Sequence, residues 1–223
     1  MKDTSIQLKT IQLTPKDFDR AVDLLVEAFY DNPAHVYIYM SSNESSRFKA
    51  IRWGFKRNLN LQASVGSSFA LVESDKSPGE REIKQMAFWH PPNSDSISIM
   101  SMIQQGLLTM PFRFGWGTFK RVLEVTEEFD AIKDRATAKN PVWYLNNMVV
   151  AKELRGTGIG SKVLKNQFES EIDPSGFPAI LMTQREANVR FYQRLGFEVV
   201  DESIVGSGEY AFTNWCMVRP SQS

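Results

Sequence analysis

An apolar run that enters a glycine-rich turn, which then opens a helix, limits what this chain can fold into. The run VWYLNNMVV, residues 142–150, is typical of a buried strand, and RGTGIG follows at residues 155–160. Apolar residues then recur at helical spacing over residues 160–172, PAILMT at 178–183 reads as a second strand, and NVRFYQRLG at 188–196 as a short helix. Strand, helix, strand and helix in this order predict a parallel strand pair.

The rest of the chain predicts an antiparallel setting for that pair. A helix should begin with Thr14 as its cap and Pro15 in its first turn, and end near Tyr30, before Asn32 and Pro33. Further expected elements are a strand over residues 5–13, a helix over 45–62, a hairpin of 67–74 and 82–92, two or three helices in an insert over 93–140, and a late strand over 209–220. We therefore expect an α/β (α+β) class with a mixed, mostly antiparallel central sheet flanked by helices, as a single domain over residues 1–223.

Charge and cysteine content exclude several classes of partner and compartment. The 26 basic and 26 acidic residues give a net charge of zero, so no overall field would hold nucleic acid or an anionic membrane, and any anion site must be local. Cys216 is the single cysteine and cannot form an intramolecular disulfide. With no secretion signal at the start and no apolar run of about 20 residues, we expect a cytoplasmic protein that does not cross a membrane.

The glycines of RGTGIG indicate contact between a ligand and bare backbone. Free N–H groups and the dipole at a helix start favour an anion, and glycines let it approach, so a phosphate or pyrophosphate is the natural ligand. A Walker loop is excluded because Ser161 stands where its second glycine belongs and Val163 follows Lys162. A dinucleotide fingerprint fails too, because Ser161 replaces its third glycine and the motif comes late in the chain.

Two motifs together resemble the GCN5-related N-acetyltransferase (GNAT) superfamily. RGTGIG matches its pattern Gln/Arg-x-x-Gly-x-Gly/Ala, and NVRFYQRLGF is similar to its second signature, with Asn188, Tyr192 and Leu195-Gly196-Phe197 in the matching places. Within the superfamily, residues 142–161 and 181–197 look most like the puromycin N-acetyltransferase type. The resemblance implies the GNAT fold, whose parallel strand pair splays apart, and acetyl-CoA as co-substrate with no metal.

The resemblance also implies which residues hold acetyl-CoA. The loop would bind the pyrophosphate, the end of the preceding strand would offer backbone groups to the pantetheine arm, and Asn188 would hydrogen-bond that arm unless it serves as a helix N-cap. The implied set is Met148, Val149, Val150, Arg155, Gly156, Thr157, Gly158, Ile159, Gly160, Ser161, Asn188 and Tyr192. A tight turn before a helix, with strand side chains in the core, is the plain alternative.

The chemistry needs a proton donor for the leaving thiolate and an acceptor for the amine proton. Tyr192 is the candidate acid. Relatives of the puromycin type often carry a His before the Trp-Tyr of the central strand and a Glu in the next strand, where this chain has Val142 and Met182. His90 is therefore the candidate base, with Glu73, Glu127 and Glu128 or a water chain as weaker choices. The second histidine, His35, is expected to be structural or exposed.

These residues predict direct transfer of an acetyl group from acetyl-CoA to a primary amine of a small molecule, by a monomer or homodimer. A protein or peptide N-acetyltransferase and a non-catalytic acyl-CoA sensor stay open as alternatives. Cys216, in a late apolar strand, should be buried and inert. Aromatic residues of the insert, Phe112, Phe114, Trp116 and Phe119, could line an acceptor pocket or pack in the core.

Overall fold

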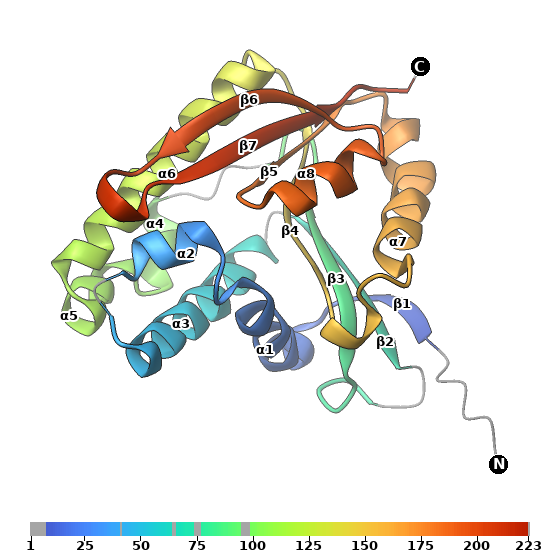
Figure 1. Ribbon diagram of the computed structural model, residues 1–223. Coiled ribbons are helices and arrows are strands. Elements are labelled where there is room, and N and C mark those ends of the chain that lie inside the picture. Colours follow the sequence, from blue (N-terminus) through green and yellow to red (C-terminus); the bar gives the residue numbers. More distant parts are fainter. Residues whose placement is uncertain (1–7, 41, 64–65, 74–76, 95–98, 223) are drawn as a thin grey trace.

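A twisted seven-stranded sheet with helices on both faces forms the centre of the molecule (Figure 1). The computed structural model describes residues 8–40, 42–63, 66–73, 77–94 and 99–222. Its strands are β1 (Leu8–Gln12), β2 (Ser67–Glu73), β3 (Ile83–His90), β4 (Trp143–Val150), β5 (Ala179–Thr183), β6 (Glu198–Val205) and β7 (Phe212–Arg219). They lie in the order β1-β2-β3-β4-β5-β7-β6, and every neighbouring pair is antiparallel except β4 and β5. The expected mixed, mostly antiparallel sheet with one parallel pair is confirmed.

Helices connect these strands and cover the sheet. The α-helices are α1 (Phe18–Phe29), α2 (Pro33–Ile38), α3 (Glu44–Gln62), α4 (Ile99–Gln104), α5 (Met110–Phe114), α6 (Trp116–Thr137), α7 (Ile159–Gln167) and α8 (Glu186–Gln193). Short 3-10 turns are η1 (Pro15–Asp17), η2 (Leu107–Thr109), η3 (Lys152–Leu154), η5 (Asp173–Ser175) and η6 (Gly208–Tyr210), and η4 (Phe168–Ile172) is a π-helical end of α7. The insert between β3 and β4 is helical as expected. That the whole chain is one domain stays a prediction.

The first helix begins as the sequence predicts and ends where expected, but a helix follows it that the sequence did not predict. Thr14 forms a capping box with Asp17, and Tyr30 caps the end of α1. Asn32 and Pro33 were expected only to end a helix, yet they start α2: the Asn32 side chain accepts a hydrogen bond from the Ala34 N–H at 2.9 Å. The same Asn-Pro pair can end one helix and start the next, because Pro at the first helical position has a suitable fixed φ and has no N–H that needs a hydrogen bond.

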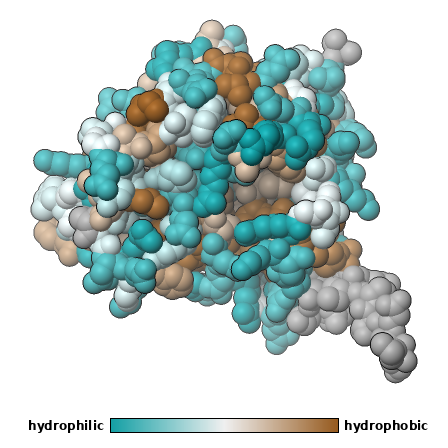
Figure 2. Space-filling model, viewed as in Figure 1, coloured by the Kyte–Doolittle hydropathy of each residue, from teal (hydrophilic) through white to brown (hydrophobic). Residues whose placement is uncertain are grey.

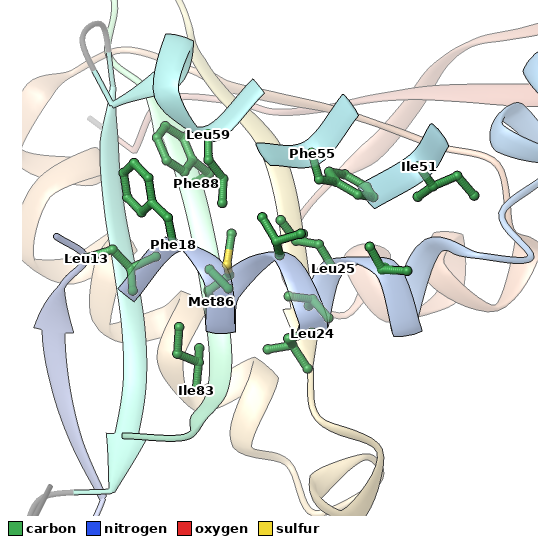
Figure 3. Packing of buried hydrophobic residues seen from close by; sticks show 14 of the residues in the cluster. Leu13, Phe18, Leu24, Leu25, Ile51, Phe55, Leu59, Ile83, Met86 and Phe88 are labelled. Atoms are coloured by element: carbon green, nitrogen blue, oxygen red, sulfur yellow. The ribbon is translucent and has the colours of Figure 1, made fainter. Parts of the chain in front are cut away.

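One face of the sheet packs against α1 and α3. Alternate residues of β3, Met86 and Phe88, point to this face and meet Leu25 of α1 and Leu59 of α3, as Figure 3 shows. These side chains are nearly or fully buried, so each takes almost all of its apolar surface out of water when the chain folds. The layer holds α1 rigidly against β3 and β4, so that its C-terminal end lies beside the site described below.

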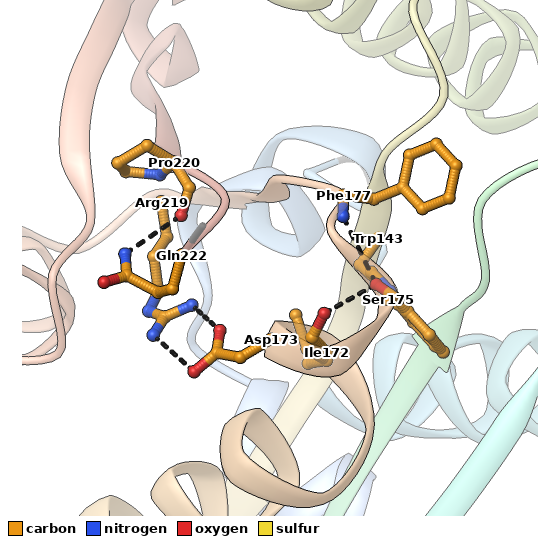
Figure 4. Close-up of polar contacts among 8 residues, drawn as sticks. All are labelled: Trp143, Ile172, Asp173, Ser175, Phe177, Arg219, Pro220 and Gln222. Carbon is orange, nitrogen blue, oxygen red and sulfur yellow. Dashed lines mark hydrogen bonds and ion pairs between the residues drawn. The ribbon is translucent and has the colours of Figure 1, made fainter.

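The opposite face packs against α7, η4 and α8. Ala87 and Trp89 of β3 lie on this face, with Leu164 of α7 and Tyr192 of α8 in the same cluster. Arg219 at the end of β7 forms a forked ion pair with Asp173 of η5, with a distance of 3.0 Å between Nη2 and Oδ2 (Figure 4). These contacts hold the chain after α7 against the end of β7.

Strands β4 and β5 stay paired over three residues and then part. The pairs are Trp143 with Ala179, Tyr144 with Ile180, and Leu145 with Leu181, after which β4 continues to Val150 beside β3 alone. The register of β3 and β4 shifts beside Leu145, where a bulge inserts one extra residue in β4. The splayed pair leaves space between the strands at this end of the sheet.

Strand β6 is the one strand that the sequence reading missed. It pairs only with β7 at the edge of the sheet, and most of its residues are exposed or half-buried. Because an edge strand has little to bury, its sequence EVVDESIV lacks the apolar alternation that reveals a strand. In the part of the chain that the structure describes, no helix is long and apolar enough to cross a membrane.

Candidate active site

A cavity of about 480 Å³ lies where β4 separates from β5. The end of β4, the glycine loop, the start of α7, α8 and the C-terminal end of α1 contribute its lining. In the view of Figure 1 these elements surround the open end of β4, and the space-filling view of the same side shows hydrophilic side chains around hydrophobic surface near the centre (Figure 2). The cavity joins the elements that carry both sequence motifs.

The loop takes its shape from two glycines with positive φ. Gly156 has φ of 79° and Gly158 has φ of 83°, values that L side chains rarely adopt. A Cβ at either position would meet no atom within 4 Å, so backbone conformation, and not lack of space, requires glycine there. Both glycines line the cavity with their backbone uncovered.

Gly160 is needed for a different reason. It lies in the first turn of α7 against β4, and a Cβ there would lie 3.0 Å from Met148 Cε and 3.2 Å from Val150 Cγ2. The absence of a side chain lets the helix start approach the strand closely. The N–H groups of the first turn of α7 have no partner within the helix, and they open beside the cavity with the positive end of the helix dipole.

Three arginines add positive charge to the same cavity. Arg155, Arg185 and Arg194 line it, and no Asp or Glu is found among the described residues of the lining. Arg155 Nε donates to the Val150 carbonyl at 3.0 Å, which ties the loop to the end of β4. The chain as a whole is neutral, so this positive charge is a local feature of the cavity.

Tyr192 and Asn188 come from α8 and reach the cavity from its other wall. The Tyr192 ring is buried among Phe191 and Phe197, with ring centroids 5.0 and 5.7 Å away, and burial raises the pKa of its hydroxyl above the ordinary value. The phenol therefore keeps its proton at neutral pH. Asn188 is not the N-cap considered above, because Arg185 takes that position, and its amide donates to Thr183 Oγ1 at 3.0 Å.

A second cavity, of about 640 Å³, adjoins the first. Both are lined by Phe29 and Asn32, at the junction of α1 and α2. The second cavity extends from there under α6 of the insert, with Met102, Val125 and Phe129 in its wall. The space beside the splayed strands thus has two compartments that share Phe29 and Asn32 in their walls.

Both histidines of the chain line the second cavity. Burial lowers the pKa of His90 to about 4, with a further contribution from the charge of Lys133. Burial also lowers the pKa of His35 to about 4, partly opposed by a contact of its Nδ1 with the Phe29 carbonyl at 3.0 Å. Since that carbonyl can only accept, Nδ1 carries the proton and Nε2 of His35 keeps its lone pair.

The structure brings most of the predicted site residues together. The first cavity contains every predicted acetyl-CoA residue except Thr157 and Ile159, which belong to the loop but not to the lining. His90 lies in the second cavity, as do Val142 and Met182, the apolar residues at the two positions expected for a base. His35 was expected to be structural or exposed, and its place in this lining was missed.

Other residues considered from sequence lie elsewhere. Glu127 and Glu128 are exposed on α6 and line neither cavity, and the side chain of Glu73 lies outside the described residues. Phe112 and Trp116 are exposed on the insert. Cys216 is fully buried as expected, and burial raises its thiol pKa to about 12, which disfavours the reactive thiolate.

The site shares its elements with a known family. Residues 122–199, from α6 through the start of β6, match the family model described as an acetyltransferase (GNAT) domain. About a third of the chain is therefore similar to a GNAT acetyltransferase domain. The matched residues include β4, the glycine loop and α8, and this match supports assignment as an acyltransferase.

Two curated proteins are similar to most of this chain. An uncharacterized N-acetyltransferase of Schizosaccharomyces pombe is 24% identical over 85% of this chain and 73% of its own length. A probable serine/threonine-protein kinase of Dictyostelium discoideum is 26% identical over 84% of this chain. The chain spans 20% of the length of that kinase, so the likeness concerns one part of a much longer protein.

Solved structures share the fold along almost the whole chain. A histone acetyltransferase HPA2 and related acetyltransferase from Corynebacterium glutamicum is 21% identical, with a TM-score of 0.65 and 97% of each chain covered. Arylalkylamine N-acetyltransferase 2 from Aedes aegypti is 14% identical, with a TM-score of 0.60, covering 97% of this chain and 100% of the other. At this identity the likeness shows the fold alone.

Proposed function

We propose that this protein transfers an acetyl group from acetyl-CoA to a primary amine of a small molecule, by direct attack within a ternary complex. The observation that carries the proposal is a cationic cavity on a glycine loop and helix start, joined to a second cavity at Phe29 and Asn32. One compartment suits a long polyanionic co-substrate, and the other suits its acceptor. The GNAT domain match supports the same reading.

Acetyl-CoA fits the first cavity by chemistry. The N–H groups of Gly158 to Ser161 would bind its pyrophosphate, with Arg155, Arg185 and Arg194 as charge partners. The separated end of β4, from Met148 to Val150, offers backbone groups that β5 does not use, which would hold the pantetheine arm. Asn188 would complete that contact, and Thr157 and Ile159 would shape the loop.

The reaction forms one bond and breaks one. The amine nitrogen attacks the thioester carbonyl carbon, the carbon–sulfur bond breaks, and the departing thiolate takes the phenolic proton of Tyr192. Because burial keeps this phenol protonated, it is available as an acid at neutral pH. Holding both reactants in adjoining compartments supplies much of the acceleration.

His90 is the proposed acceptor for the amine proton. Its lowered pKa leaves the imidazole neutral at pH 7, with a lone pair that the amine N–H can reach from the second cavity. His35 lies in the same lining and is a matched control, since it differs from His90 in having Nδ1 engaged with the Phe29 carbonyl. His90→Gln should reduce kcat more than His35→Gln does.

A small-molecule acceptor is favoured over a peptide because the insert helix α6 covers part of the second cavity. The sequence likeness to the puromycin N-acetyltransferase type points the same way. A sensor that binds acyl-CoA without turnover is the second candidate, favoured by Val142 and Met182, which place apolar groups where a base is expected.

Thiol release from acetyl-CoA, measured with a panel of amines and peptides, tests the proposal. Turnover with a small amine should fall at least about tenfold in Tyr192→Phe, as expected for loss of a general acid. Tyr210→Phe is the control, because this exposed phenol lies on η6 and lines neither cavity. Binding of CoA without turnover of any amine would favour the sensor instead.

A further inference from the structure

We infer that the acceptor is a monoamine whose other polar groups are uncharged hydroxyls or amides, rather than a polyamine or an amino acid. The inference rests on the proposed function and names the substrate class of the same site. It follows from the side chains around the second cavity, which combine many carboxamides with almost no free charge.

Seven carboxamide side chains line this cavity. They come from α3, β4 and the loops after α1, β3 and β5, and they are Asn32, Asn58, Gln62, Asn93, Asn146, Asn147 and Gln184. A carboxamide presents both a donor and an acceptor, which matches hydroxyl and amide groups. Between them lie apolar walls, so a ligand here meets hydrogen-bonding groups at defined places.

Some of these carboxamides are already engaged with one another. Asn32 Nδ2 donates to Gln184 Oε1 at 3.0 Å, and Gln184 Nε2 donates to Asn214 Oδ1 at 2.7 Å. Gln62 Nε2 donates to Asn58 Oδ1 at 2.8 Å. These bonds orient the amides, which favours recognition of one pattern of ligand groups.

Three amides are left for a ligand, Asn93 after β3 and the neighbours Asn146 and Asn147 of β4. Neighbouring strand residues normally point to opposite faces, but the bulge in β4 falls beside them and both contribute to the lining. Within the described part of the chain, none of these three side chains has a hydrogen bond partner in the protein. Their donors and acceptors are therefore available to an acceptor molecule in this compartment.

The described lining has two charged side chains, Asp130 and Lys133, and they are of opposite sign. Asp130 and Lys133 form an ion pair at 3.5 Å, and the Lys133 ammonium also lies 5.6 Å from the centre of the Tyr144 ring. Neither His35 nor His90 is charged at pH 7. A second ammonium or a carboxylate on the acceptor would have to leave water, and the described lining offers it no unpaired counter-charge. Burying such a charge is costly.

The test compares amines that differ in one group on the same propyl chain: aminopropanol, β-alaninamide, diaminopropane, β-alanine and propylamine. For each we would measure kcat/KM with acetyl-CoA, and binding to the CoA-saturated protein by calorimetry. Because a mismatched polar group weakens binding, kcat/KM for the alcohol or the amide should exceed that for the diamine and the acid at least about tenfold.

The outcomes separate the inference from the proposed function. Turnover that is as fast with diaminopropane or β-alanine as with the uncharged pair overturns the inference and keeps the enzyme. Preferential binding of the uncharged pair without any turnover supports the inference about the cavity and contradicts the proposed function. Absence of both binding and turnover for the uncharged pair overturns the inference.

A charge variant gives a second readout. Asn147→Asp keeps the shape of the side chain and adds a negative charge to the cavity, so the preference should move at least about tenfold toward diaminopropane. Asn166→Asp, the same change on the exposed surface of α7, is the matched control and should leave the preference unchanged. An unchanged preference in Asn147→Asp would overturn the inference.

Discussion

Removal of Arg81 should destabilise this protein far more than removal of any exposed arginine. Arg81 Nε and Nη2 donate to the two carboxylate oxygens of Asp17 at 2.9 and 2.8 Å, and both residues are buried. The pair ties η1 to the turn between β2 and β3, whose Gly79 N–H also donates to Asp17. Arg81→Met keeps much of the volume but leaves the buried carboxylate without its counter-charge.

The expected loss follows from that uncompensated charge. Breaking a buried ion pair by removing one partner costs about 3–5 kcal/mol, which for a chain of this size lowers Tm by roughly 6–20 °C. Arg52→Met is the matched control, because Arg52 pairs with Asp23 at the exposed surface and should cost less than about 1 kcal/mol. In the double variant with Asp17→Asn, the two losses should not add, since one interaction is removed twice.

The pH dependence has a definite sign. Burial raises the pKa of Asp17, but hydrogen bonds from Arg81, Thr14 and Gly79 outweigh it and hold that pKa well below the usual value. A carboxyl with a lowered pKa contributes stability above the pKa of the unfolded chain, and that contribution is lost as pH falls below it. Urea unfolding should therefore show a large gap between wild type and Arg81→Met at pH 7 and a smaller gap near pH 3. A gap below about 1 kcal/mol at pH 7, or one that widens in acid, would refute the reasoning.

Three further predictions concern the site and its surroundings. Gly158→Ala should weaken CoA binding about five- to thirtyfold by calorimetry, because an alanine in the left-handed conformation costs about 1–2 kcal/mol. Gly54→Ala inside α3 is the control and should not change CoA binding. Equal CoA affinities of wild type and Gly158→Ala would contradict the loop geometry. Both histidines have a lowered pKa of about 4 in the folded protein, so the unfolded chain binds protons first as pH falls from about 6.5 to 4. The free energy of unfolding should therefore fall over this pH range. The double variant His35→Gln with His90→Gln should show a flatter dependence on pH. Cys216 should react with a thiol reagent only on unfolding, because burial raises its pKa to about 12; rapid labelling of the native protein would refute this.

Local patterns predicted the parts of the site that lie close together in sequence. The run from Met148 to Ser161 contains a strand end, a turn that needs glycines and a helix start, and each has a direct physical signature. Tyr192 and Asn188 could be chosen because the second motif fixes their spacing. The parallel pair followed from the order of strand, helix and strand.

Other features depend on tertiary packing and have no local signature. Arg185 and Arg194 approach the glycine loop only because α8 packs across β5, and a lone arginine in sequence gives no sign of this. His35 lines the second cavity because α2 starts at Asn32-Pro33, where the sequence suggested only a helix end. Asn146 and Asn147 share a compartment because of a bulge that the apolar run does not reveal.

The most direct test of the account is a calorimetric titration of CoA and of pantetheine into wild type and into Arg185→Ala with Arg194→Ala. CoA should bind wild type, with an affinity that falls as salt is added, and more weakly to the double variant, whereas pantetheine should bind both equally and weakly because it lacks the phosphates. Failure of CoA to bind wild type, or equal binding of CoA to both proteins at every salt concentration, would contradict the role given to the glycine loop and its arginines.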